Sequence, residues 1–170
     1  DQGKADADER ASLAKLNEAI TAAEKLQEQA DERESQRQRA ELKKEYAAIL
    51  EQQASLATEA MPLMGKELNR RERVTARQLG ERQGEIRAMM DALRSKAEGM
   101  EEARVFMFAH RRTDDAMARA AQRLTSGSTT PALAADHAGA IRGLQQLIQA
   151  LSDSMQKRDF REDDGGGGGG

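Results

Sequence analysis

The residues with the most chemical content form a basic pattern near the middle of the chain. They are Lys66, Arg70, Arg73 and Arg77. Because the steps between them are four, three and four residues, a helix places all four side chains on one face. A basic region that leads into an apolar heptad ladder is how basic-zipper proteins grip the DNA major groove. The pattern therefore predicts an anion-binding face as one alternative.

Acidic residues disfavour nucleic acid as the partner of this face. Glu72, Glu81 and Glu85 lie within or just after the basic pattern, and the whole chain has a net charge of −3. Domains that bind nucleic acids are usually strongly basic. We therefore do not expect nucleic-acid binding, and we predict that the basic face pairs with the acidic first part of the chain.

The two histidines, His110 and His137, do not form a metal-binding pattern. Zinc sites use three or four ligands, and Asp114, four residues after His110, is a single weak companion. The chain has no Cys, which excludes disulfides and thiol catalysis. It also lacks a Glu-x-x-His pair, a G-x-S-x-G elbow and a Walker loop. We expect no enzyme, no cofactor and no metal site, with both histidines on the surface or in a helix seam.

The composition predicts that helices must position any site. Ala, Glu, Leu, Lys and Arg make up about half of the 170 residues, which is typical of long helices and coiled coils. Aromatic residues make up 2%, whereas strands are rich in aromatic and β-branched residues. The predicted fold class is therefore all-α: an elongated antiparallel helical hairpin or coiled-coil bundle of three or four helices.

Apolar residues recur in steps of three and four, and breaks divide the chain into elements. The predicted elements are an acidic long helix at 1–61, a Pro/Gly turn at 62–65, a basic helical arm of one or two helices at 66–125, a loop at 126–131, a C-terminal helix at 132–158 and a flexible acidic and polyglycine linker at 159–170. The alternating charge of these arms favours antiparallel pairing.

Two of the boundaries stay open. The polar stretch 31–41 separates two apolar stripes that are out of heptad register, so it is either a continuous helix with a stutter or a break. We favour the helix because no Gly or Pro interrupts it. The turn at 62–65 is either a hairpin loop, which we favour, or a kink in one helix.

Apolar stripes are the predicted seams of this fold, and three of them lie in the first helix and in the C-terminal helix. The first helix carries one stripe before the polar stretch and one after it, and the C-terminal helix carries a candidate interaction seam. The stripes are Leu13, Leu16, Ile20, Ala23 and Ala30; then Leu42, Tyr46, Ile49, Gln53, Leu56, Ala60 and Leu63; and in the C-terminal helix Ile141, Leu144, Ile148, Leu151 and Met155.

The segment from about Ala103 to Phe160, with the Gly run after it, has a recognisable apolar pattern. It reads V-F, R-T-x-D-x-M and A-x-x-L, then the loop around Gly127, then H-A, I-x-x-L-x-x-L-I-x-A-L and D-F. In this pattern the chain resembles large uncharacterised bacterial proteins that are rich in coiled coil. The resemblance implies no catalytic residues. It implies an envelope-associated or extracytoplasmic parent, with any membrane contact made by other parts of that parent.

The function expected from these observations is that of a non-catalytic coiled-coil structural or protein-interaction module. Its partners would be other helices, either of another protein or of a second copy in a homo-oligomer. The chain begins at Asp1 and ends in glycines, from which we expect a fragment of a larger bacterial protein. The alternative is binding of nucleic acid or an anionic surface through the face from Lys66 to Arg77.

Overall fold

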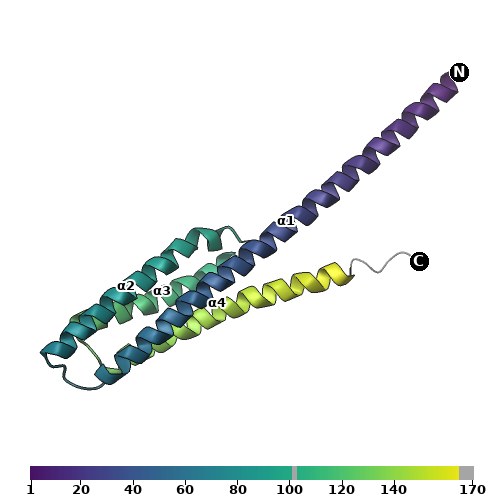
Figure 1. The fold of residues 1–170 in the computed structure, drawn as a ribbon. Helices are drawn as coiled ribbons and strands as arrows, with labels where there is room; N and C mark the ends of the chain where they lie inside the picture. The colour runs from purple at the N-terminus through teal and green to yellow at the C-terminus, as the bar shows by residue number, and fades with distance from the viewer. Residues whose placement is uncertain (101–102, 165–170) are drawn as a thin grey trace. The chain divides into compact units, whose positions relative to one another are not determined.

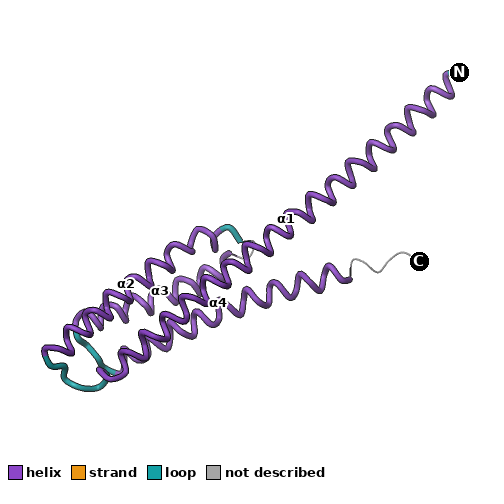
Figure 2. The backbone as a smooth tube through the Cα atoms, in the orientation of Figure 1, coloured by secondary structure: helices purple, strands orange, loops and turns teal. Residues whose placement is uncertain are grey.

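A computed structural model describes residues 1–100 and 103–164, with side chains up to residue 157. The helices are α1 (Gln2–Ala60), the short 3-10 helix η1 (Met61–Leu63), α2 (Arg70–Glu98), α3 (Ala103–Ser126) and α4 (Pro131–Asp164) (Figure 1). The part of the chain that the structure describes contains no strand (Figure 2). The prediction of an all-α bundle is thus confirmed. None of these described helices is long and apolar enough to cross a membrane.

The chain divides into two compact units, and α1 contributes to both. The second unit, from Arg39 onward, is a bundle of four helices in which successive helices run in opposite directions (Figure 1). The loops after α1 and after α3 lie at the same end of this bundle (Figure 2). There the backbone N–H of Gly65 donates to the carbonyl of Thr129 at 2.8 Å, which ties the two loops together.

The turn between α1 and α2 is a loop and not a kink. Pro62 lies in η1, where its missing N–H interrupts the helical hydrogen bonds. Gly65 then has a φ of +72°, a conformation that glycine adopts without the clash of a Cβ. Asn69 caps α2: its side chain accepts from the N–H of Glu72, whose carboxylate accepts from the N–H of Asn69. This capping box starts α2 at Arg70, so the predicted start of the basic arm at residue 66 was too early.

The other predicted boundaries also need correction. The basic arm was predicted as one or two helices, and it is two, α2 and α3, because α2 ends at Glu98 before Gly99. The second loop is shorter than predicted, since α3 continues to Ser126 and α4 begins at Pro131, a residue suited to a first helical turn. The backbone at 159–164 continues α4, whereas we predicted a flexible linker there. The remaining part of that linker, 165–170, lies outside the described residues.

The bundle core contains the second of the predicted stripes in full. All seven residues of the stripe that runs from Leu42 in α1 to Leu63 in η1 are buried. Small residues bring some helices close together: a Cβ on Gly80 of α2 would lie 3.0 Å from the backbone N of Thr125, and a Cβ on Gly143 of α4 would lie 3.0 Å from the Cβ of Thr113. Long side chains such as Tyr46 and Gln53 lie between α1 and its neighbours. The size of the side chains at a contact sets the distance between the helix axes.

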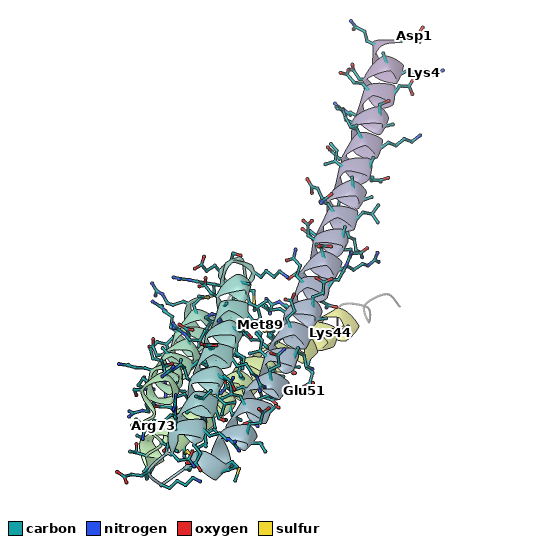
Figure 3. All side chains as sticks on the ribbon, turned by 60° about the vertical axis from the view of Figure 1, so that its left-hand side comes forward. Asp1, Lys4, Lys44, Glu51, Arg73 and Met89 are labelled. Carbon is teal, nitrogen blue, oxygen red and sulfur yellow. The ribbon has the colours of Figure 1, made fainter. Side chains whose placement is uncertain are left out.

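The first unit, Asp1–Gln38, is the N-terminal part of α1. The helix is unbroken through 31–41, as we favoured. Side chains surround it on all sides, as they do near Asp1 and Lys4 (Figure 3). Its apolar stripe is exposed: Leu13 is 54%, Leu16 56% and Ile20 47% accessible to solvent. This stripe is therefore buried by no other described residue.

Candidate functional site

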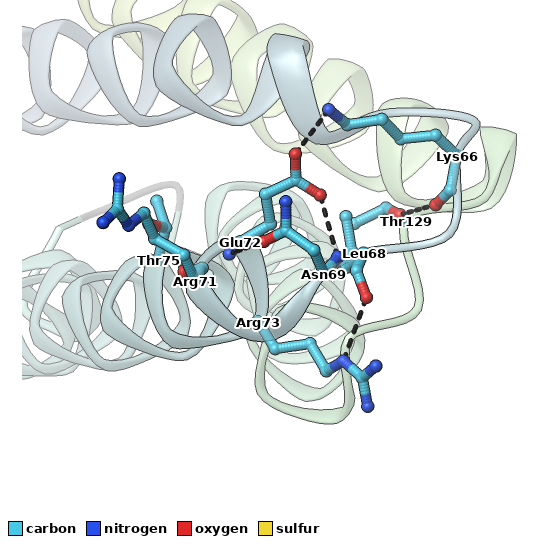
Figure 4. A network of polar contacts seen from close by, with 8 residues as sticks. All are labelled: Lys66, Leu68, Asn69, Arg71, Glu72, Arg73, Thr75 and Thr129. Carbon is cyan, nitrogen blue, oxygen red and sulfur yellow. Dashed lines mark hydrogen bonds and ion pairs between the residues drawn. The ribbon is translucent and has the colours of Figure 1, made fainter.

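The basic pattern does not form one helical face in the structure. Lys66 lies in the loop before α2, where its Nζ pairs with a carboxylate oxygen of Glu72 at 2.7 Å (Figure 4). This contact lowers the pKa of Glu72. The guanidinium of Arg73 donates from Nε to the carbonyl of Leu68 at 3.0 Å. Two of the four predicted residues are therefore engaged in holding the loop around the start of α2.

The other two predicted residues, Arg70 and Arg77, are exposed on α2. Neither makes an ion pair within the described part of the chain. The expected pairing with acidic residues of α1 is made further along α2. Arg82 pairs with Glu59 at 2.8 Å, and Lys96 pairs with Glu45 at 2.9 Å, both between exposed groups. The prediction that the basic face itself pairs with α1 was wrong. Lys66 and Arg73 instead contact residues around the start of α2, and Arg82 and Lys96 make the ion pairs with α1.

A polar layer crosses the middle of the core. The side-chain amides of Gln53 on α1 and Gln83 on α2 donate to each other, at 2.9 and 2.6 Å, and both residues are fully buried. The amide nitrogen of Gln53 also lies 3.2 Å from Nδ1 of His137 on α4. The Nε2 of His137 is buried without a hydrogen-bond partner among the described residues. Because each amide satisfies the other, these glutamines can be buried at little net cost.

A second polar contact joins α1 to α3. The Oη of Tyr46 lies 2.8 Å from Nδ1 of His110, and the ring of Tyr46 packs edge-on against Phe106 with centroids 5.7 Å apart. Burial raises the pKa of Tyr46, assisted by the charge of Glu45, so the phenol keeps its proton in this contact. Burial also lowers the pKa of both His110 and His137. Both imidazoles are therefore neutral at neutral pH, and both lie in the helix seam.

One carboxylate joins α3 to α4. Asp136 accepts hydrogen bonds from Nε of Arg119 at 3.0 Å and from Nε of Arg123 at 2.7 Å. Burial works to raise the pKa of Asp136, but these two guanidinium groups outweigh it and lower that pKa. Asp136 remains ionised and structural, because both of its oxygens are occupied by arginines of the same bundle.

The predicted C-terminal seam faces the interior of the protein's own bundle. Leu144 and Leu151 are fully buried, whereas Ile141, Ile148 and Met155 are half-buried beside them. The continuous buried line of α4 consists of Leu133, His137, Ala140, Leu144, Leu147 and Leu151. The buried residues of this seam therefore pack inside the protein's own bundle and are not free for another partner.

An exposed apolar surface lies on α3. Val105 is 77% and Phe108 60% accessible, and the guanidinium of Arg112 lies 5.9 Å from the ring centre of Phe108. Beside them runs a groove of about 390 Å³ between α3 and α4, with small residues such as Ala109 and Gly143 among those that line it. Large exposed apolar groups of this kind mark contact surfaces.

Sequence reasoning missed the buried partners of Gln53. Gln83 continues the three-and-four spacing of Leu79 and Ile86 along α2, and His137 does so between Leu133 and Ala140 on α4. A polar residue at a heptad core position is the signal that could have found both.

No protein family model, curated protein or solved structure matches the chain. No group of three or more His, Cys, Asp or Glu side chains within 1–100 and 103–164 is arranged to hold a metal ion.

Proposed function

We propose that the chain is a non-catalytic structural or protein-interaction module. The observation that carries this proposal is the exposure of large apolar side chains on helices. Leu13, Leu16 and Ile20 follow one face of α1, and Val105 and Phe108 lie on α3. Exposed apolar groups in rows or clusters favour contact with another protein surface.

The use of the polar groups supports the same proposal. The histidines, the tyrosine and the buried glutamines are bound to one another inside the bundle, and Asp136 is held by two arginines. These groups position helices, which is the work of a scaffold. The resemblance to bacterial coiled-coil proteins adds an envelope-associated location to the proposal.

The second candidate is anion binding near the start of α2. Arg70 and Arg77 are exposed and free of ion pairs among the described residues, which favours it. Lys66 and Arg73 weaken it, because both are engaged with the loop. Binding of duplex DNA and of anionic vesicles, measured by fluorescence anisotropy and sedimentation at two salt concentrations, separates the candidates. Micromolar binding that weakens steeply with salt, and that R70E/R77E removes, would replace our proposal.

A positive test uses the exposed apolar surface of α3. A photo-crosslinking amino acid at position 108 should capture a defined protein in extracts of the source organism, and the same amino acid at the exposed position 122 of α3 should capture less of it. V105E should abolish the capture while the melting temperature stays unchanged, because Val105 is 77% accessible. Equal capture at both positions would count against an interaction module.

A further inference from the structure

The apolar stripe of the first unit is a heptad seam. From residue 6 to residue 37 of α1, the seam positions alternate in steps of three and four. They are Asp6, Glu9, Leu13, Leu16, Ile20, Ala23, Gln27, Ala30, Glu34 and Arg37. The centre of the seam is apolar and both ends are charged, so the segment has the pattern of a short coiled coil.

A helix with such a seam is stabilised when a second helix covers the seam. Leu13, Leu16 and Ile20 are each about half accessible, and no described residue covers them. Isolated helices are marginally stable in water, and most helical stability comes from packing of an apolar face. The seam therefore needs a second helix, and its residues determine which one fits.

We infer that the partner is a second copy of this segment, in an antiparallel two-helix coiled coil. This inference rests on the proposed interaction function and gives the partner of one surface. In antiparallel order, Leu13 faces Ala30 of the second copy, and Ile20 faces Ala23 of the second copy. Leu16 faces Gln27 of the second copy. Large residues then meet smaller ones in every central layer, which lets the layers interdigitate.

The charged ends of the seam determine the orientation. A parallel pair would place Asp6, Glu9, Glu34 and Arg37 each opposite its own copy, so all four layers would carry like charges. An antiparallel pair places Asp6 opposite Arg37 of the second copy, which is attractive. Its one unfavourable layer, Glu9 opposite Glu34, is moderated because Glu34 is paired with Arg37 in its own helix at 3.0 Å.

The residues beside the seam favour the same orientation. In an antiparallel coiled coil, Arg10 lies opposite Asp31 of the second copy, and Leu26 lies over Ala19 of the second copy. Leu26 is 67% accessible on the free helix, so this contact covers an apolar group that the seam itself leaves out. A parallel pair brings together no oppositely charged residues at these flanking positions. Charge and shape therefore both specify an antiparallel second copy.

Sedimentation equilibrium of the full chain tests whether the dimer forms. The mass should rise with concentration from 18.7 kDa to twice that value. L16E/I20E should abolish the rise. The matched control is A14E/A22E, which adds the same charge to the same helix at exposed positions outside the seam and should still dimerise. A mass of 18.7 kDa at every concentration would overturn the inference, as would equal dissociation of both variants.

Charge reversal tests the orientation. R10D alone and D31R alone should each weaken the dimer by about tenfold, and the double variant R10D/D31R should restore it. In a parallel pair, positions 10 and 31 of the two copies are about 32 Å apart, so the double variant would restore nothing. Absence of restoration would overturn the antiparallel arrangement.

Cysteine crosslinking gives an independent readout because the chain has no Cys. A mixture of L13C and A30C should form the mixed disulfide, whereas A30C alone should not crosslink. Ready crosslinking of A30C alone would indicate a parallel pair and would overturn the inference. Failure of these tests leaves the capture through α3 unaffected, so failure of the dimer can be distinguished from failure of the proposed function.

Discussion

Gly143 allows α3 and α4 to approach each other, and replacing it with Ala tests this packing. A Cβ at this position would contact Oγ1 of Thr113 and would lie 3.0 Å from its Cβ and 3.2 Å from its Cγ2. Thr113 is 1% accessible, and its hydroxyl donates to the carbonyl of Ala109 at 2.8 Å. Rotation of this branched side chain moves one substituent out of the way and another into it, so the helices must separate.

The magnitude follows from two opposing effects. Ala is a better helix former than Gly by about 1 kcal/mol, which favours G143A. Overpacking of a tight core contact costs about 1–3 kcal/mol, and the separated helices also strain the hydrogen bond of Thr113. We expect a net loss of up to about 2 kcal/mol in the free energy of unfolding, or up to roughly 8 °C in melting temperature.

Thermal unfolding followed by circular dichroism measures this loss, with G84A as the control. Gly84 is exposed on α2, and a Cβ there meets nothing within 4 Å, so only the helix propensity changes. G84A should therefore stabilise the protein by about 1 kcal/mol. T113A should make the change at Gly143 less costly. Equal effects of G143A and G84A would refute the close approach of α3 and α4.

Three further changes test the polar core and a helix cap. Lowering the pH from 7.5 to 5.5 should lower the melting temperature, because burial lowers the pKa of His110 and His137 and the unfolded chain then binds protons that the folded chain does not. The stability that comes from keeping these histidines neutral is complete above about pH 6.5, and below that pH it falls by up to about 1.4 kcal/mol per pH unit for each histidine. H137Q should make the melting temperature depend less on pH. An unchanged dependence would contradict the burial of a neutral His137. Q53L should cost about 1–3 kcal/mol because it leaves the buried amide of Gln83 unpaired, and Q53L/Q83L should cost less than the sum of the single changes in urea unfolding. N69A should cost about 1 kcal/mol through loss of the capping box, and an unchanged urea midpoint would contradict that role.

Much of the fold could be predicted because helix periodicity is a local property. The stripe from Leu42 to Leu63 is buried throughout. Both histidines lie in a helix seam, which was one of the two positions expected for them, the other being the surface. The boundaries were less predictable. Asn69 starts α2 only because Glu72 completes a capping box with it, and the Gly65 turn is tied to a loop more than 60 residues later in the chain.

The candidate site was predictable only as a pattern of charges. The spacing from Lys66 to Arg77 predicts a common face if the helix includes all four residues. The helix begins at Arg70, so Lys66 leaves that face and pairs with Glu72. Which acidic residue of α1 meets which base of α2 depends on the packing of the two helices, and this packing selects Arg82 and Lys96.

The sequence by itself determined the helical class, the main breaks and the apolar faces, because each depends on residues within a turn or two of one another. Only the tertiary structure decided that Gln53, Gln83 and His137 meet in one layer and that the side chain of Thr113 packs against Gly143. Such contacts join residues 30 to 84 positions apart, which meet only when the helices have a definite spacing and rotation. The tertiary structure also showed that the apolar residues of the seam at 6–37 are exposed, and the inference of a second copy of this segment depends on that exposure.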